Sequence, residues 1–142
     1  MKRNFDKDLV TRIRDYLDRK PEIYSAYLFG SHAAKRTRNT SDIDIAILVD
    51  DHILKDSILF RSRLNADLQN LTGRRTDVVI LNQANLLIRA QVFEKGIILY
   101  EHDPDRRALC QAQSMGLYYD YKRYLNFHAQ QLNRKIQEAG LG

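Results

Sequence analysis

The chain has 142 residues, enough for one domain with a full hydrophobic core, and its single cysteine, Cys110, excludes an intramolecular disulfide. Because the start MKRNFDKDLVTRIRDYL is charged and the chain lacks about 18 consecutive apolar residues, we expect neither a signal peptide nor a membrane-spanning helix. The net charge of +5 predicts attraction to nucleotides, nucleic acids or an acidic protein. One cysteine and no targeting segment fit a soluble cytoplasmic protein without a membrane partner. Because basic residues are interleaved with acids outside one small cluster, we expect no sequence-specific nucleic-acid binding.

Strands alternate with helices in the first part of the chain. Apolar residues at helical spacing, followed by Pro21, predict a helix over about residues 5–20. IYSAYLF predicts a short strand that stops at Gly30-Ser31, and SDIDIAILVD predicts a buried strand after a polar loop. The next helix is closed by Gly73. Its apolar positions are Leu54, Ile58, Leu64, Leu68 and Leu71.

The alternation continues until Pro104. TDVVIL predicts a third strand, QANLLIRAQVFEK a helix that ends at Gly96, and IILYE a fourth strand. After Pro104 we expect a helical tail, which Gly116 could divide in two. We expect one side of this tail to pack on the sheet, whereas Tyr119 and Phe127 point away from it toward a partner. That side carries Leu117, Tyr121, Tyr124, Leu125, His128, Leu132 and Ile136.

These elements predict an α/β or α+β protein in which helices pack on a sheet. The linkers are too short for a second domain, so we expect residues 1–142 to form one. Its core covers about residues 5–103, and the helical tail covers about residues 104–139.

Two carboxylates stand one position apart in the second predicted strand. Asp42 and Asp44 project from the same face, while Ile43, Ile45 and Ile47 face the core. Magnesium prefers one or two carboxylates together with substrate phosphates and water, and two such ions can clamp a phosphoryl transfer. The pair therefore predicts a site for magnesium, with two ions expected.

Asp77 and Gly30-Ser31 extend this candidate site. Asp77 opens the third strand, and it would complete a three-acid cluster if that strand lies beside the second. Such a cluster repels itself without cations, and its third acid could orient or deprotonate an attacking hydroxyl. A glycine at the turn lets the backbone approach a phosphate, to which the Ser31 hydroxyl donates. The spacing links a phosphate cradle to a metal site.

Gly30, Ser31, Asp42, Asp44 and Asp77 together resemble the signature of the DNA polymerase β-like nucleotidyltransferases, and the short chain resembles the minimal nucleotidyltransferases (MNT proteins). The resemblance implies a mixed four-stranded sheet, magnesium-ATP as substrate and transfer of a nucleoside monophosphate. MNT proteins of this size are typically antitoxins of HEPN RNase toxins in type VII toxin–antitoxin systems. The resemblance therefore implies AMP transfer from ATP to a tyrosine of such a toxin.

The loop after Ser31 departs from the family pattern. Many relatives have a basic residue and then glycine where this chain has Ala34 and Lys35, so Lys35 or Arg36 could supply the charge for nucleotide contact instead. Two alternatives stay open. The chain could be a non-catalytic antitoxin that masks the toxin by binding, or it could transfer a nucleotide to a small molecule such as an aminoglycoside.

Overall fold

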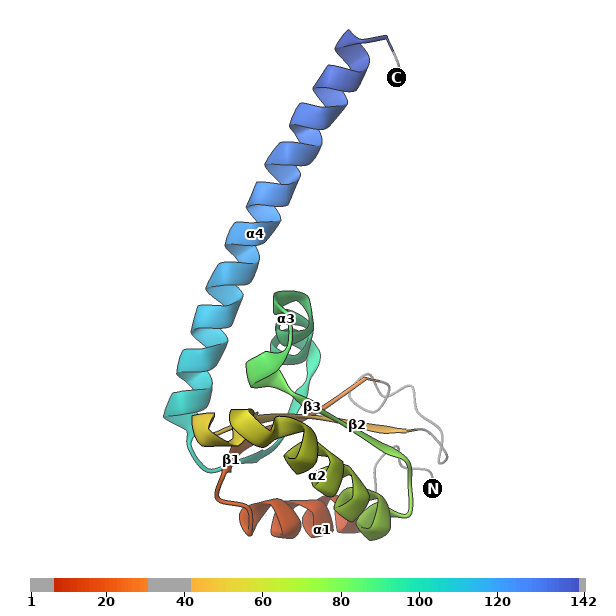
Figure 1. The fold of residues 1–142 in the computed structure, drawn as a ribbon, viewed down its shortest axis with the longest axis vertical. Coiled ribbons are helices and arrows are strands. Elements are labelled where there is room, and N and C mark those ends of the chain that lie inside the picture. The colour runs from red at the N-terminus through yellow and green to blue at the C-terminus, as the bar shows by residue number, and fades with distance from the viewer. Residues whose placement is uncertain (1–6, 31–41, 141–142) are drawn as a thin grey trace.

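A computed structural model describes residues 7–30 and 42–140, in which four strands alternate with four α-helices and two short 3₁₀ helices (Figure 1). In chain order the elements are α1 (Lys7–Asp18), β1 (Ile23–Phe29), β2 (Ile43–Val49), η1 (Asp51–Asp56), α2 (Ser57–Thr72), β3 (Thr76–Ile80), η2 (Leu81–Gln83), α3 (Leu86–Lys95), β4 (Ile97–Glu101) and α4 (Pro104–Glu138).

The strands form one mixed sheet in the order β3-β2-β1-β4. β1 runs antiparallel to both β2 and β4, whereas β2 and β3 run parallel. A tight turn cannot join parallel neighbours, and α2 provides the crossover between them. This arrangement confirms the predicted class, a mixed four-stranded sheet flanked by helices with a C-terminal helix.

Helices cover both faces of the sheet, with α1 and α2 on one side and α3 on the other (Figure 1). The apolar side chains of α1 and α2 are buried against Ile43, Ile45 and Ile47 of β2. On the opposite face of β2, Ala46 and Leu48 pack toward α3 and the beginning of α4. Because both faces are covered, β2 is apolar along nearly its whole length, as the sequence predicted.

Two boundaries differ from the sequence expectation. Asp42 lies immediately before β2 instead of inside it. Leu54 belongs to η1, and Ile58, expected on the buried side of the next helix, is 84% exposed. Ile58 lies six and ten residues before the buried Leu64 and Leu68 of the same helix, which at about 100° per residue places it roughly 120° and 80° around the helix from them and outside the buried face of α2. Gly73 closes α2 in the left-handed conformation, as predicted.

The C-terminal tail is one continuous helix, so the predicted division at Gly116 was wrong. A glycine costs about 1 kcal/mol in a helix interior, which is too little to break a helix of 35 residues. The expectation that the apolar side of the tail packs on the sheet was also wrong. Tyr121 and Leu132 are 52% and 58% exposed because α4 extends far beyond the sheet (Figure 1). No helix in the described ranges is long and apolar enough to span a membrane.

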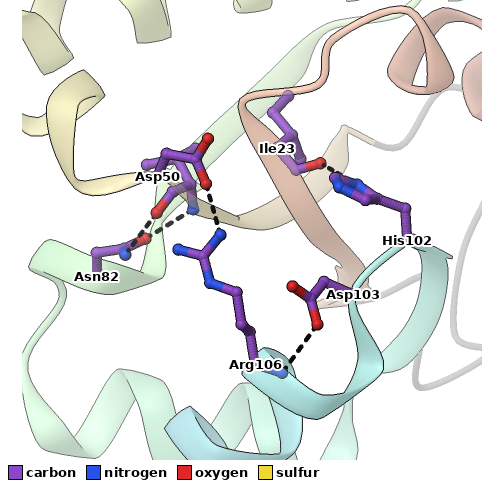
Figure 2. A network of polar contacts seen from close by, with 7 residues as sticks. Ile23, Asp50, Asn82, His102, Asp103 and Arg106 are labelled. Atoms are coloured by element: carbon purple, nitrogen blue, oxygen red, sulfur yellow. Dashed lines mark hydrogen bonds and ion pairs between the residues drawn. The ribbon is translucent and has the colours of Figure 1, made fainter.

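Polar contacts anchor the base of α4 to the end of β2 that lies opposite Asp44 (Figure 2). Arg106 forms an ion pair with Asp50 at 2.6 Å and lies over the Tyr24 ring, 4.0 Å from its centroid. The Asp103 carboxylate caps the helix by accepting a hydrogen bond from the Arg106 backbone N–H at 3.2 Å. These contacts set the direction in which α4 leaves the sheet.

Candidate active site

A glycine turn at the end of β1 lies directly against the carboxylate of Asp44. Gly30 has a φ of +73°, which favours glycine over residues with a side chain. Its neighbour Phe29 is the Cα partner of Asp44 across the antiparallel β1–β2 pair. A Cβ built on Gly30 would lie 2.3 Å from Oδ2 of Asp44, a distance that real contacts do not reach. Glycine is therefore required both by the turn and by the close approach of the carboxylate.

Asp44 and Asp77 are direct neighbours across the parallel β2–β3 pair, in which each is the Cα partner of the other. Adjacent strands lie about 4.8 Å apart, and partners in register project from the same face. Asp44 is half-buried and Asp77 is exposed. Asp42 is exposed one residue before β2 begins. The tertiary structure thus brings Gly30 and the three acids to one end of the sheet.

The alternation along β2 gives Asp44 its orientation. Ile43 and Ile45 pack toward α1 and α2, whereas Ala46 packs on the opposite side, toward α3. Side chains alternate between faces, so Asp44, the second residue of β2, belongs to the face that carries Ala46. This placement explains how a carboxylate is accommodated beside a strand whose following residues, Ile45 to Val49, are all buried.

Two contacts that the sequence did not reveal support the acidic strand ends. The backbone N–H of Ile43 donates to the Arg75 carbonyl at 2.9 Å, which joins the segments before β2 and β3. The Asn65 side-chain oxygen accepts from the Val78 backbone N–H at 3.0 Å, on the residue next to Asp77. Asn65 lies in the middle of α2, and no motif marks it, because its role arises only from the packing of α2 on β3.

The remaining predicted site residues, Ser31, Lys35 and Arg36, belong to residues 31–41 and lie outside the described part of the chain. Within residues 7–30 and 42–140, no three His, Cys, Asp or Glu side chains stand close enough to hold a metal ion by themselves. The donors at the sheet end nevertheless fit magnesium in their chemistry. They are carboxylates on adjacent strands, and magnesium commonly completes its shell with water and substrate phosphates.

A turn that admits backbone close to a carboxylate, next to a second carboxylate on the neighbouring strand, defines a class of site suited to phosphoryl or nucleotidyl transfer. The sequence matches the family described as "Polymerase beta, Nucleotidyltransferase" over residues 11–105. The chain therefore belongs to this nucleotidyltransferase family and has its polymerase β-like fold. The match runs from α1 to the first turn of α4 and includes the whole sheet.

Solved structures share the fold over nearly the whole chain. A chain from "Crystal structure of the toxin-antitoxin with AMP-PNP" is 24% identical with a TM-score of 0.66, covering 90% of this chain and 98% of that one. A chain from the toxin–antitoxin MntA-HepT is 23% identical with a TM-score of 0.61, covering 93% and 99%.

A third similar structure comes from Shewanella oneidensis, a tri-AMPylated HEPN toxin in complex with MNT antitoxin. Its matching chain is 23% identical with a TM-score of 0.62, covering 92% of this chain and 98% of that one. No curated protein sequence matches the chain significantly. At these identities the structures establish the fold, and the family match establishes the nucleotidyltransferase class.

Proposed function

We propose that this nucleotidyltransferase is a cytoplasmic type VII antitoxin that transfers AMP from ATP to a tyrosine of a HEPN RNase toxin. The observation that carries the proposal is the meeting of Gly30 with Asp44 and Asp77 at one end of the sheet. The similar solved structures support it, because one is a toxin–antitoxin with AMP-PNP and another contains an AMPylated HEPN toxin with its MNT antitoxin.

Each predicted site residue has a separate role in this reaction. The Gly30 turn and the Ser31 hydroxyl hold the β and γ phosphates, with Lys35 or Arg36 adding positive charge. Asp42, Asp44 and Asp77 would hold magnesium, which when bound neutralises the phosphates and polarises the α-phosphorus. Asp77 orients the tyrosine and takes up its phenolic proton. The phenolic oxygen forms a bond to the α-phosphorus, and the bond to the leaving pyrophosphate breaks in line with it.

A labelling experiment tests the transferase. The chain is incubated with α-³²P-labelled ATP, magnesium and the HEPN protein that the proposal expects an adjacent reading frame to encode, and label on the HEPN protein is measured. We expect the variant Asp42→Ala with Asp44→Ala to lose on the order of 100-fold or more in rate, because the charge-stabilising groups are gone. Asp51→Ala with Asp56→Ala removes the same charge from two exposed acids beyond the other end of β2 and should transfer normally.

A second candidate is an antitoxin that acts by binding alone, and the long exposed face of α4 favours it. The two functions differ in the same assay combined with a growth assay. Label on a HEPN tyrosine and loss of protection in the Asp42→Ala, Asp44→Ala variant support catalysis. Protection by that variant without any label on the partner rejects it. The absence of an adjacent HEPN reading frame would favour a small-molecule acceptor such as an aminoglycoside.

A further inference from the structure

The face of α4 that packs on the rest of the protein is covered only along the first part of the helix. Cys110 and Met115 are partly buried against the core cluster that includes Val92 and Phe93 of α3, and Ser114 is 2% exposed. Positions three or four residues further along a helix return to the same face. That face continues past Ser114 through residues that no other described part of the chain covers. We call it the α4 stripe, and it consists of Leu117, Tyr121, Tyr124, Leu125, His128 and Leu132.

The α4 stripe is apolar and exposed. Among its members, Tyr124 is 58% exposed and Leu125 is 46% exposed. Tyr124 lies parallel to Tyr121 with ring centroids 6.5 Å apart, and its centroid is 4.2 Å from that of His128 on the following turn. The rings therefore form a continuous aromatic surface. An exposed contiguous surface of this kind on a soluble domain marks a contact with another molecule.

A groove adjoins the stripe where the beginning of α3 meets α4. It has a volume of about 530 Å³ and lies between the segment Asn85–Leu87 and the stripe residues Tyr121 and Leu125, with Tyr118 and Lys122 at its border. Leu87 is 55% exposed at its wall. Apolar side chains spaced by three and four residues form a ridge, and a ridge beside a groove is the shape that receives a second helix.

The charges around the stripe disfavour a second copy of this chain as the occupant. From one end to the other they read Asp120, Lys122, Arg123, then Arg134, Lys135, Glu138. Residues 117–138 therefore carry more positive than negative charge, and two copies packed along α4 bring two such positive segments together. Like charges that face each other between helices are destabilising, whereas four cations and two anions attract an acidic partner.

We propose that the α4 stripe and the adjoining groove are the docking surface for an acidic helical segment of the protein that this chain modifies. The proposal rests on the proposed function for the identity of that protein, and it adds where on this chain the substrate binds. Residues 117–138 of α4 extend about 30 Å at 1.5 Å per residue, which is enough for several turns of a docked helix. Docking is thereby carried by residues other than the acids at the end of the sheet.

Binding measurements with purified HEPN protein test the surface. We expect Tyr121→Ser with Leu125→Ser to weaken the dissociation constant at least about tenfold, since buried aromatic and apolar residues dominate helix docking. The matched control is Asn126→Ser with Gln130→Ser, two exposed polar residues on the other side of the same helix, and it should change binding less than twofold. Unchanged circular dichroism and unchanged AMP-PNP binding show that the stripe variant is folded.

Charge reversal tests the kind of partner. Lys122→Glu with Lys135→Glu should also weaken binding relative to wild type, and this loss of affinity should become smaller as the salt concentration is raised. The proposal is overturned if the stripe variant binds HEPN protein as tightly as wild type does. It is also overturned if sedimentation shows that the wild-type chain alone is a dimer and the stripe variant is a monomer. If HEPN protein binds through the stripe but receives no label, the transferase proposal fails and the docking surface stands. If the stripe variant transfers label as fast as wild type at limiting concentrations of HEPN protein, the docking-surface proposal fails and the transferase proposal stands.

Discussion

Gly30 is constrained both by its backbone conformation and by its contact with Asp44, and substitutions at Gly30 and at a control glycine can separate the two effects. Its positive φ disfavours any L-residue by about 1–2 kcal/mol, and a Cβ would collide with Asp44. We expect Gly30→Ala to be destabilised by about that amount and to displace the Asp44 carboxylate, with a loss of at least tenfold in AMP transfer. Urea unfolding and the labelling assay measure the two effects.

Gly73 is the matched control for this prediction. It has a φ of +67°, and nothing lies within 4 Å of where its Cβ would be. Gly73→Ala should therefore show a similar loss in the free energy of unfolding with no change in transfer rate. A Gly30→Ala protein that transfers AMP at the wild-type rate would contradict the role of the close approach to Asp44.

Tyr27 is buried in the sheet, and its hydroxyl has no hydrogen-bond partner among the described residues. Burial raises the pKa of Tyr27 to about 12. Because removal of an unpaired buried hydroxyl is close to neutral, Tyr27→Phe should change the unfolding free energy at pH 7 by less than about 1 kcal/mol. Tyr16→Phe, which loses a hydrogen bond to Asp67, should cost about 1 kcal/mol.

The raised pKa of Tyr27 also predicts a pH dependence. Between about pH 10 and 12 the folded protein retains the phenolic proton that the unfolded chain has lost, so stability decreases as pH rises through this range. Tyr27→Phe should lose less stability than wild type over the same interval in thermal unfolding. Equal alkaline losses in the two proteins would show that the phenol is not protonated and buried as described.

At the scale of the elements, α4 shows how local preference and context combine. Its N-terminal cap, with Asp103 before Pro104, is readable in the sequence, and the helix begins where it was predicted. The apolar positions of the stripe were also recognised from the sequence, but their exposure to solvent was not predicted. Helical periodicity records which side chains share a face and contains no information on whether the protein itself or a partner covers that face.

Gly116 provides a prediction for this helix. It lies in the helix interior with nothing within 4 Å of a Cβ, so Gly116→Ala should stabilise the protein by about 0.5–1 kcal/mol through reduced freedom of the unfolded chain. Gly140 has a φ of +73° beyond the helix end, and Gly140→Ala should give no stabilisation there. Thermal unfolding compares the two. A destabilised Gly116→Ala protein would indicate a bend at this position.

The whole molecule consists of a packed body and a helix that leaves it. Ser114 is the last buried residue of α4, and no described residue after it is buried. A chain that ends at Asn126 should therefore lose less than about 1 kcal/mol of unfolding free energy. A chain that ends at Leu109 also lacks Cys110 and Met115, which are partly buried against the core, and the buried Ser114, and should lose at least about 3 kcal/mol.

Binding and stability should separate in these truncated chains. The chain that ends at Asn126 lacks His128 and Leu132 of the α4 stripe, so we expect it to remain folded and to bind HEPN protein more weakly. Urea titration gives the stability, and calorimetry gives the affinity. A large loss of stability on removal of residues 127–142 would mean that the distal part of α4 contributes to the fold instead of serving a partner.

The sequence by itself determined the type of nearly every element and singled out Asp42, Asp44 and Asp77 as candidate site residues, because periodicity, turn residues and charges within apolar runs are local signals. It did not determine that Asp77 is the register partner of Asp44, that Gly30 lies against the Asp44 carboxylate, or that Asn65 supports β3. Strand order and register depend on long-range packing of α2 and the sheet. Only the tertiary structure could also show that the body ends before the apolar face of α4 does, since burial is a property of all the elements together.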